Sequence, residues 1–277
     1  MMKIKFLELT NTSARFVLSD ATPALANALR RTLLCEIPKL AIDRVEILLG
    51  NIRDESGKEY ESVTPLFDEI IAHRLALVPL PTDLTMKFPE ECSCNGEGCP
   101  SCSVIYTINK KGPGIVYSGD LIPLGDPKFK PVDDLIPIVK INDKQAVLLY
   151  ATAIMGRGKE HAKWQVAHAV GYKYYPSVKI DGEKCDNCMK CVKYCPKKVF
   201  EVNEGKVGVK IVEACDLCNS CVEVCPRGAV TVQGSEKDFI FTFETDGSLS
   251  AKVALSKALE ILSKSFGQVK DMLSMLG

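Results

Sequence analysis

CDNCMKCVKYCP at residues 185–196 and CDLCNSCVEVCP at residues 215–226 are one pattern used twice, C-x2-C-x2-C-x3-C-P. In this spacing three thiolates hold one iron–sulfur cluster, while the fourth cysteine of the run ligates the cluster of the other run. The proline that ends each run stops the chain from continuing as a helix. The spacing therefore predicts two [4Fe–4S] clusters, held by two sets of thiolates: Cys185, Cys188, Cys191 and Cys225 for the first, and Cys195, Cys215, Cys218 and Cys221 for the second.

Two other uses of these cysteines explain the pattern less well. Four disulfides would require an oxidising compartment, and nothing in the sequence directs the chain to one. Two zinc sites could use the C-x2-C pairs, but tetrahedral zinc needs four ligands and leaves the register of the other cysteines unexplained. Residues 181–233 resemble a bacterial-type two-cluster ferredoxin, which implies a small iron–sulfur module within a longer chain.

The totals are those of an ordinary soluble protein. The 277 residues are 46% hydrophobic and 25% charged, and 35 Lys and Arg balance 35 Asp and Glu. A formal net charge of zero provides no overall electrostatic footprint for nucleic acid, so we expect no direct sequence-specific binding of DNA or RNA. The start, MMKIKF, lacks the apolar run of a signal peptide, and no apolar stretch is long enough for a membrane span. Together with 13 cysteines, this favours a reducing cytoplasm and metal ligation.

A second group of cysteines occupies one short loop, CSCNGEGCPSC at residues 92–102. Its C-x-C-x4-C-x2-C spacing offers four thiolates on a tight, glycine-containing loop, which suits a closed tetrahedral zinc site. We expect Cys92, Cys94, Cys99 and Cys102 to hold one Zn²⁺, with free or paired thiols as the alternative.

Periodicity marks the elements on either side of these cysteines. A helix capped by Thr22 begins at Pro23 and ends before Pro38, and a shorter one is expected around residues 66–75. Residues 51–64 are polar and predict a loop. From about residue 250 to 276, apolar residues alternate at spacings of 4 and 3, typical of a helix packed along a partner helix, with an ordinary core helix as the alternative. Strand-like runs cover residues 4–9, 14–18, 44–49, 104–108, 136–141, 146–151 and 239–244.

Four motifs carry a wider resemblance. They are NALRRTLLCEIP at residues 27–38, AHRLALVPL at 72–80, GRGKEHAKW at 156–164 and FTFETDGS at 241–248. In this order they are similar to motifs of the α-type assembly subunits of cellular RNA polymerases, and with the iron–sulfur insertion the chain resembles the archaeal, D-type members of that family. Eukaryotic relatives carry a zinc loop similar to residues 92–102, with one residue fewer in its middle gap.

The resemblance implies an α+β fold with three parts. Residues 1–41 and 234–277 would form a discontinuous α-type dimerisation domain. Residues 42–166 would form an inserted mostly-β domain with the candidate zinc loop, and residues 167–233 an inserted bacterial-type 2[4Fe–4S] ferredoxin-like domain. The implied function is assembly: a heterodimer with the small subunit L, on which subunits N and P and the two large catalytic subunits are mounted. Nucleotidyl transfer during transcription would belong to the large subunits, so we assign this chain no catalytic residues.

The partner surface implied by the resemblance lies on the two apolar helices near the ends of the chain. The residues expected to contact partner subunits are Leu25, Leu29, Arg30, Arg31, Leu33, Leu255, Leu259, Leu262, Phe266, Val269 and Leu273. The clusters would stabilise a small module or act as a redox gate on assembly. An alternative function from another class is electron transfer by a ferredoxin fused to a docking scaffold, which leaves both helices without a role.

Overall fold

The computed structural model describes residues 2–53, 55 and 57–275. The chain divides into two compact units, each built from segments that are far apart in the sequence. The first unit lies within residues 1–9, 14–30 and 169–243, and the second within residues 10–13, 31–168 and 244–277. The fold is α+β, as predicted, with inserted modules between the two ends of the chain.

A four-stranded sheet joins the two ends of the chain. Its order is β1 (Lys3–Leu9), β2 (Ser13–Ser19), β14 (Val230–Thr245) and β11 (Ala167–Ile180). Phe239, Phe241 and Phe243 alternate along β14, and all three are fully buried. The ring of Phe16 on β2 stacks on Phe241 with centroids 5.3 Å apart. Burial of this aromatic face holds an N-terminal hairpin to a C-terminal strand.

The first helix, α1 (Pro23–Cys35), has the predicted start: the backbone N–H of Leu25 donates to Thr22 Oγ1 at 3.2 Å. Leu29 and Leu33 are buried in the chain's own core, whereas Leu25 is half-buried. Part of the apolar face of α1 therefore packs within the chain.

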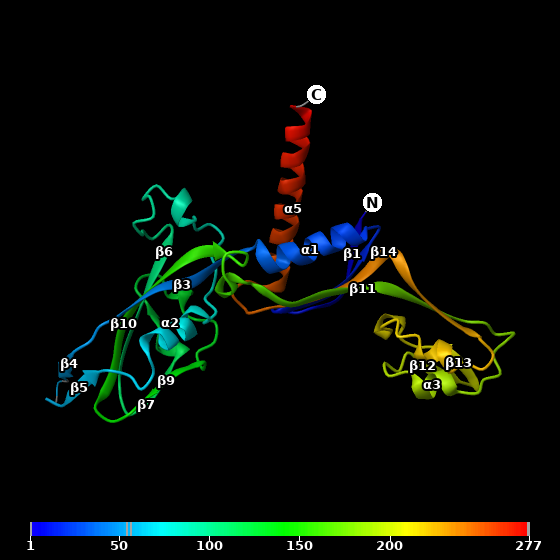
Figure 1. The fold of residues 1–277 in the computed structure, drawn as a ribbon, viewed down its shortest axis with the longest axis horizontal. Helices are drawn as coiled ribbons and strands as arrows, with labels where there is room; N and C mark the ends of the chain where they lie inside the picture. The colour runs from blue at the N-terminus through cyan, green and yellow to red at the C-terminus, as the bar shows by residue number, and fades with distance from the viewer. Residues whose placement is uncertain (1, 54, 56, 276–277) are drawn as a thin grey trace. The chain divides into compact units, whose positions relative to one another are not determined.

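Strands β11 and β14 lead out of the sheet into a small module (Figure 1). The backbone N–H of Asp181 donates to the carbonyl of Ala229 at 2.8 Å and closes its neck. Apolar side chains of the module pack around the buried thiols of Cys191, Cys215 and Cys221. The elements of the module are α3 (Lys190–Tyr194), the antiparallel pair β12 (Phe200–Asn203) and β13 (Lys206–Val209), a short 3-10 helix (Val212–Ala214) and α4 (Ser220–Glu223).

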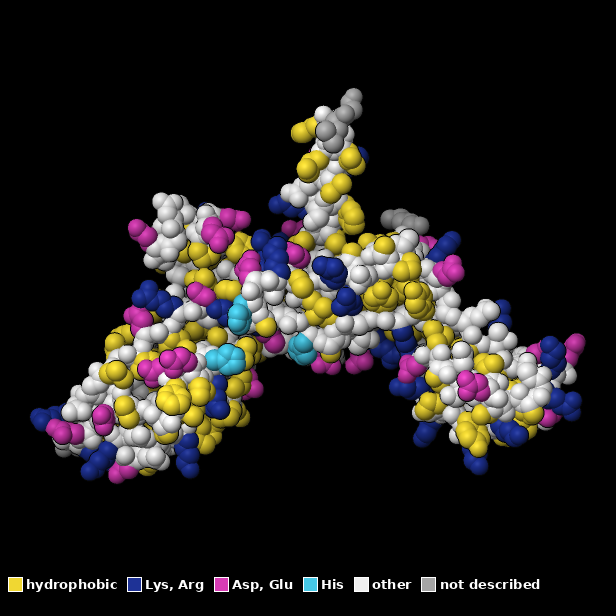
Figure 2. Space-filling view, in the orientation of Figure 1, with side chains coloured by type: hydrophobic (Ala, Val, Ile, Leu, Met, Phe, Trp, Pro, Cys, Tyr) yellow, Lys and Arg dark blue, Asp and Glu magenta, His cyan; other side chains and the backbone are white. Residues whose placement is uncertain are grey.

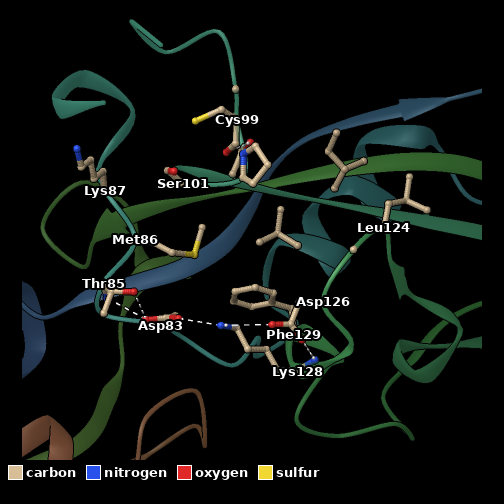
Figure 3. A pocket seen from close by; sticks show the side chains of 16 residues that line it. Asp83, Thr85, Met86, Lys87, Cys99, Ser101, Leu124, Asp126, Lys128 and Phe129 are labelled. Atoms are coloured by element: carbon tan, nitrogen blue, oxygen red, sulfur yellow. Dashed lines mark hydrogen bonds and ion pairs between the residues drawn. The ribbon is translucent and has the colours of Figure 1, made fainter. Parts of the chain in front are cut away.

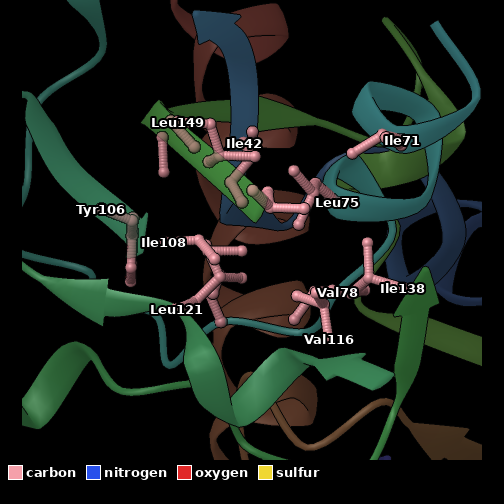
Figure 4. Packing of buried hydrophobic residues seen from close by; sticks show 14 of the residues in the cluster. Ile42, Ile71, Leu75, Val78, Tyr106, Ile108, Val116, Leu121, Ile138 and Leu149 are labelled. Atoms are coloured by element: carbon pink, nitrogen blue, oxygen red, sulfur yellow. The ribbon is translucent and has the colours of Figure 1, made fainter. Parts of the chain in front are cut away.

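The second unit contains the mostly-β insert. Its main sheet has the order β4-β5-β10-β6-β8, and β3 pairs with the far part of β10. Helix α2 and the small β7–β9 sheet enclose a core that includes Ile42, Leu75 and Ile108 (Figure 4). The bounds are β3 (Pro38–Ile47), β4 (Asn51–Arg53), β5 (Glu59–Ser62), α2 (Asp68–Ala76), β6 (Ser103–Lys111), β7 (Gly114–Tyr117), β8 (Ile122–Pro123), β9 (Pro137–Ile141) and β10 (Gln145–Arg157).

The insert differs from the sequence prediction in two places. The expected loop at residues 51–64 is wrong for residues 51–53 and 59–62, which form β4 and β5. Strand β3 begins at Pro38, six residues before the expected run at 44–49, because residues 38–42 enter the buried sheet directly after α1.

Helix α5 (Ala251–Ser274) ends the described chain, and the side chain of Ser250 accepts from the backbone N–H of Val253 at its start. The backbone N–H of Ala251 donates to the carbonyl of Asn11 at 2.8 Å, so the N-terminal turn and the C-terminal helix meet within the second unit. No described helix combines the length and hydrophobicity that a membrane span requires.

Candidate metal centres

The four thiols of the second predicted set line one cavity in the iron–sulfur module. Cys195 comes from the first run, and Cys215, Cys218 and Cys221 come from the second. Apolar side chains complete the wall: Val178, Val199, Phe200 and Val232. Thiols converging on an apolar enclosure from two separate runs fit a cluster that bridges the runs.

The four thiols of this set also influence one another's ionisation. Burial raises the pKa of Cys221 to about 11, and the charges of Cys195, Cys215 and Cys218 raise it further. Hydrogen bonding from Ser220 lowers the pKa of Cys218. Because a metal binds thiolates, ligation at this site releases protons and stabilises sulfurs that otherwise repel one another.

In the first predicted set, the pKa values of Cys191 and Cys225 shift in opposite directions. Burial raises the pKa of Cys191, and the charges of Cys185 and Cys188 add to this. Burial alone would raise the pKa of Cys225 as well, but hydrogen bonds from the backbone N–H groups of residues 227–230 lower it overall. The backbone N–H of Ala229 donates to Cys225 Sγ at 3.2 Å.

The two runs share their backbone conformation. Asn187 and Met189 in the first run, and Leu217 and Asn219 in the second, all have φ between 54° and 59°. Left-handed conformation is unfavourable for side chains such as Met and Leu and persists only where the surroundings impose it. Both cysteine runs therefore form a loop of the same shape. Such a loop can direct its first three thiolates toward one cluster.

Ion pairs cross between the runs in the same way. Asp186 follows Cys185 and lies 3.7 Å from Arg227 Nε, which follows the other run. Asp216 follows Cys215 and lies 2.8 Å from Lys197 Nζ. The second run has one further cation: Lys173 on β11 donates to the Cys215 carbonyl at 2.8 Å and to Asp216 at 2.9 Å.

Further bonds attach the second run to the four-stranded sheet. Arg15 of β2 donates to the carbonyl of Glu213 at 3.2 Å, and the hydroxyl of Tyr175 on β11 donates to the Glu213 carboxylate at 3.0 Å. Sequence reasoning missed Lys173, Arg15 and Tyr175, because their partners lie 38 to 198 residues away and no local pattern marks them. The two candidate cluster sites are therefore held differently.

The four cysteines of residues 92–102 meet in the insert. All four sulfurs lie within 4.8 Å of one another. The Sγ–Sγ distance is 3.5 Å for Cys92 and Cys99 and for Cys94 and Cys102, and 3.7 Å for Cys99 and Cys102. Thiolates about 2.3 Å from a tetrahedral zinc stand about 3.8 Å apart, so this arrangement fits the ion.

The thiols of this loop are not joined by disulfides. All 13 cysteines lie in the described part of the chain and all are free, and a bonded pair would have its sulfurs about 2.05 Å apart. Hydrogen bonding from Cys102 and Cys92 lowers the pKa of Cys94, whereas burial raises the pKa of Cys102. Cys94 therefore ionises more readily than an ordinary cysteine and Cys102 less readily. A bound cation would stabilise the thiolate form of both.

A cavity of about 580 Å³ adjoins this loop (Figure 3). Three of its charged groups pair with one another: Asp83 accepts from Lys128 Nζ at 3.0 Å and from the Thr85 hydroxyl at 2.6 Å, and Lys128 lies 3.4 Å from Asp126. Hydrogen bonds from Thr85 hold the pKa of Asp83 at about 2. Because Asp83, Lys128 and Asp126 already satisfy one another, this network links residues 83–85 to residues 126–128.

The predicted partner residues range from buried to exposed. Leu29, Leu33 and Leu255 are buried within the chain, and Leu25, Leu259 and Leu262 are half-buried. Phe266, Val269 and Leu273 are 59%, 54% and 64% exposed. Figure 2 shows hydrophobic side chains along this half of α5. Arg30 donates to Asn27 at 3.0 and 3.1 Å, whereas Arg31 is exposed, with no partner among the described residues.

Comparisons with known proteins match both inserted modules and the whole chain. Residues 51–172 match the RNA polymerase Rpb3/RpoA insert domain, and residues 177–226 match the 4Fe-4S dicluster domain. The chain is similar to proteins named DNA-directed RNA polymerase subunit Rpo3. It is 46% identical to that of Picrophilus torridus over 98% of this chain and 99% of the relative, and 44% identical to that of Thermoplasma volcanium over 99% and 100%. Identity to that of Methanothermobacter thermautotrophicus is 45%, over 97% of each chain.

Proposed function

This chain belongs to the archaeal family of DNA-directed RNA polymerase subunit Rpo3, and we propose that it is a non-catalytic assembly subunit of such an enzyme. In this role it forms a heterodimer with the small subunit L in the cytoplasm. The heterodimer is the platform for subunits N and P and for the two large subunits, which carry out nucleotidyl transfer.

The observation that carries this proposal is the outer half of α5. Its first half is anchored by buried residues, including Leu255, whereas Phe266, Val269 and Leu273 expose an apolar face at heptad spacing. Such a face is unfavourable in water and is typical of a helix completed by a partner helix. Leu25 and Arg31 of α1 are further proposed partner contacts, while the buried Leu29 and Leu33 belong to the chain's own core.

Co-purification with subunit L tests the proposal. Phe266→Asp places a carboxylate in the apolar face and should abolish the heterodimer. Gln268→Asp is the control, because it adds the same charge two residues away, on the opposite side of the helix. Equal amounts of heterodimer with both variants would contradict the proposed interface.

We further propose that the module holds two [4Fe–4S] clusters in the predicted sets and that residues 92–102 hold one zinc. The shared cavity of the second set and the repeated left-handed loops support the clusters, and the sulfur distances support zinc. The clusters supply ligation that stabilises a small module and a capacity for one-electron chemistry. The chain positions the thiolates and excludes water from them with Val199 and Phe200.

Metal analysis of anaerobically prepared protein tests this assignment. Two such clusters and one zinc predict about eight irons and one zinc per chain. Cys191→Ser and Cys221→Ser should each remove about half the iron and leave the zinc. A wild-type chain with about four irons would show that one site is not used.

If the clusters act as a redox gate on assembly, air oxidation should weaken the binding of subunit L. Unchanged affinity for L after complete cluster loss would exclude the gate.

A further inference from the structure

A groove of about 500 Å³ opens in the second unit. Its walls come from α5, from the end of β10 and from residues 84–91, which lead into the cysteine loop of residues 92–102. Five Lys and Arg side chains line it, against three Glu side chains. The groove therefore carries an excess of positive charge in a chain whose formal net charge is zero.

Two of the five cations are neutralised inside the groove wall. Lys159 Nζ lies 3.0 Å from the Glu36 carboxylate, and Lys257 Nζ lies 2.8 Å from the Glu260 carboxylate. These pairs use two of the three glutamates. Three basic side chains therefore share the groove with one remaining carboxylate.

The three remaining cations are Lys87, Arg157 and Lys264. None of them has a carboxylate partner among the described residues, and neither has the remaining acid, Glu91, a cation partner there. Lys87 and Lys264 are exposed at the edges of the groove, whereas Arg157 is half-buried. Charge that is partly removed from water and left without a counter-charge favours an anionic partner.

Arg157 is the cation whose position is fixed. Its guanidinium lies over the ring of Phe88, 4.3 Å from the centroid, and its backbone N–H donates to the Glu160 carboxylate at 3.0 Å. The next residue is Gly158, where a Cβ would collide with the carbonyl oxygen of Leu34. Because the ring contacts a face of the planar guanidinium, the N–H donors at its edge remain available to bind a carboxylate through two parallel hydrogen bonds.

The other wall residues favour a polypeptide over a nucleic acid. Met86, Phe88 and Ile261 add apolar surface to the groove, and its glutamates add negative charge. A nucleic-acid backbone carries one negative charge per nucleotide, so those glutamates would repel it. A peptide segment with a few carboxylates between apolar side chains complements both features.

We propose that this groove receives an acidic segment of another polymerase subunit. One carboxylate of the segment binds the guanidinium of Arg157, others pair with Lys87 and Lys264, and its apolar side chains pack on Met86 and Ile261. Lys264 lies two residues before Phe266, or about 200° around the helix axis, so this partner is separate from subunit L. The proposal rests on the proposed function only in taking the partner to be a polymerase subunit.

A synthetic hexapeptide of alternating Glu and Leu tests the groove without the polymerase. Its binding to the full-length chain is followed at low salt by the anisotropy of an attached dye. A hexapeptide of alternating Lys and Leu controls for binding to the exposed apolar half of α5, and a single-stranded thymidine hexamer stands for nucleic acid. We expect saturable binding of the Glu–Leu peptide, about tenfold tighter than that of either control.

Charge variants locate the binding. The double variant Lys87→Glu with Lys264→Glu should weaken the Glu–Leu peptide about tenfold, and Arg157→Gln should weaken it about as much by removing a charged hydrogen-bond donor. Lys252→Glu is the matched control, because Lys252 is an exposed lysine of α5 outside the groove wall. We expect less than about a twofold change from it.

Three results would overturn the proposal. They are no saturable binding of the Glu–Leu peptide, equal weakening by Lys252→Glu and by the double variant, and tighter binding of the thymidine hexamer, which would assign the groove to nucleic acid.

Carbodiimide cross-linking in the assembled polymerase tests the partner, because this reagent joins a lysine amine to a carboxylate only where the two are in contact. We expect Lys87 or Lys264 to be joined to Asp or Glu of a subunit other than L, and Lys252 not to be joined to the same peptide. Cross-links to L alone, within this chain alone, or none from either lysine would refute a separate partner. If the chain does not enter the polymerase, the proposed function fails, and the peptide titrations still decide whether the groove binds an acidic segment.

Discussion

Lys173→Met should selectively release the cluster that we propose for the second set. The Lys173 ammonium donates to the Cys215 carbonyl and pairs with Asp216, and both groups belong to the loop that carries three of the four second-set thiolates. Methionine keeps most of the side-chain volume and removes the charge and the donors. The loop then loses its only described cation from β11, while the thiolates themselves are unchanged.

The size of the effect follows from the contacts. A hydrogen bond from a charged group contributes about 1.5–3 kcal/mol, and an exposed ion pair about 0.2–1 kcal/mol. The side chains of Lys173 and Asp216 are 29% and 42% exposed, so the lower part of each range applies. We expect opening of the loop to become easier by about 2 kcal/mol, or roughly 30-fold.

Anaerobic transfer of iron to a ferrous chelator measures this opening. In the variant, half of the iron should leave about 30-fold faster than in the wild type, and the other half at the wild-type rate. Arg227→Met is the control at the first site, because its guanidinium is 66% exposed and lies 3.7 Å from Asp186, and we expect less than about a threefold change. Wild-type kinetics for Lys173→Met, or equal acceleration of both halves, would refute the reasoning.

Three further predictions concern stability and zinc. The ammonium of Lys39, which is 4% exposed, pairs with the carboxylate of Asp246. Lys39→Met should lower the free energy of unfolding by about 3 kcal/mol in urea, because Asp246 then keeps its charge with only the hydrogen bonds from Ser248. Adding Asp246→Asn should recover stability, and an additive loss would contradict this. Cys94→Ser should remove the zinc that we propose for residues 92–102 and leave the iron content unchanged, as measured by metal analysis. Zinc retained in this variant would exclude Cys94 as a ligand. Asp83 has a pKa of about 2 when folded, against an ordinary value of 3.8, so its contribution is present above about pH 4 and is lost as the pH falls toward 2. The difference in unfolding free energy between wild type and Asp83→Asn should therefore be constant from about pH 7 to 5 and shrink below pH 4, and a difference that grows in acid would reverse the sign.

The sequence predicts best where short-range chemistry decides the structure. Thr22 and Pro23 mark the start of α1, and the alternating phenylalanines of residues 239–243 lie on one buried face, because both signals lie within a few residues of the element they define. The C-x-C-x4-C-x2-C spacing likewise brings its four sulfurs together within a single loop.

The rest depends on contacts between distant residues. Strands β4 and β5 are polar and have no strand signal, yet they form because β5 finds hydrogen-bond partners on β10 and β4 finds them on β5. The apolar spacing of α5 does not reveal where the helix leaves the core, so buried Leu255 and exposed Phe266 look alike in the sequence.

Because Asp181 and Ala229 are joined at the neck, the iron–sulfur module occupies the position of the loop that connects β11 to β14. Strands β11 and β14 are neighbours in the sheet, and the backbone hydrogen bond from Asp181 to Ala229 spans the place where the module leaves them. A tight turn could replace residues 182–228 without altering the register of the strands below. A lineage could therefore gain or discard the metal-bearing part in one genetic step, and redesign could graft a different sensor at the same place.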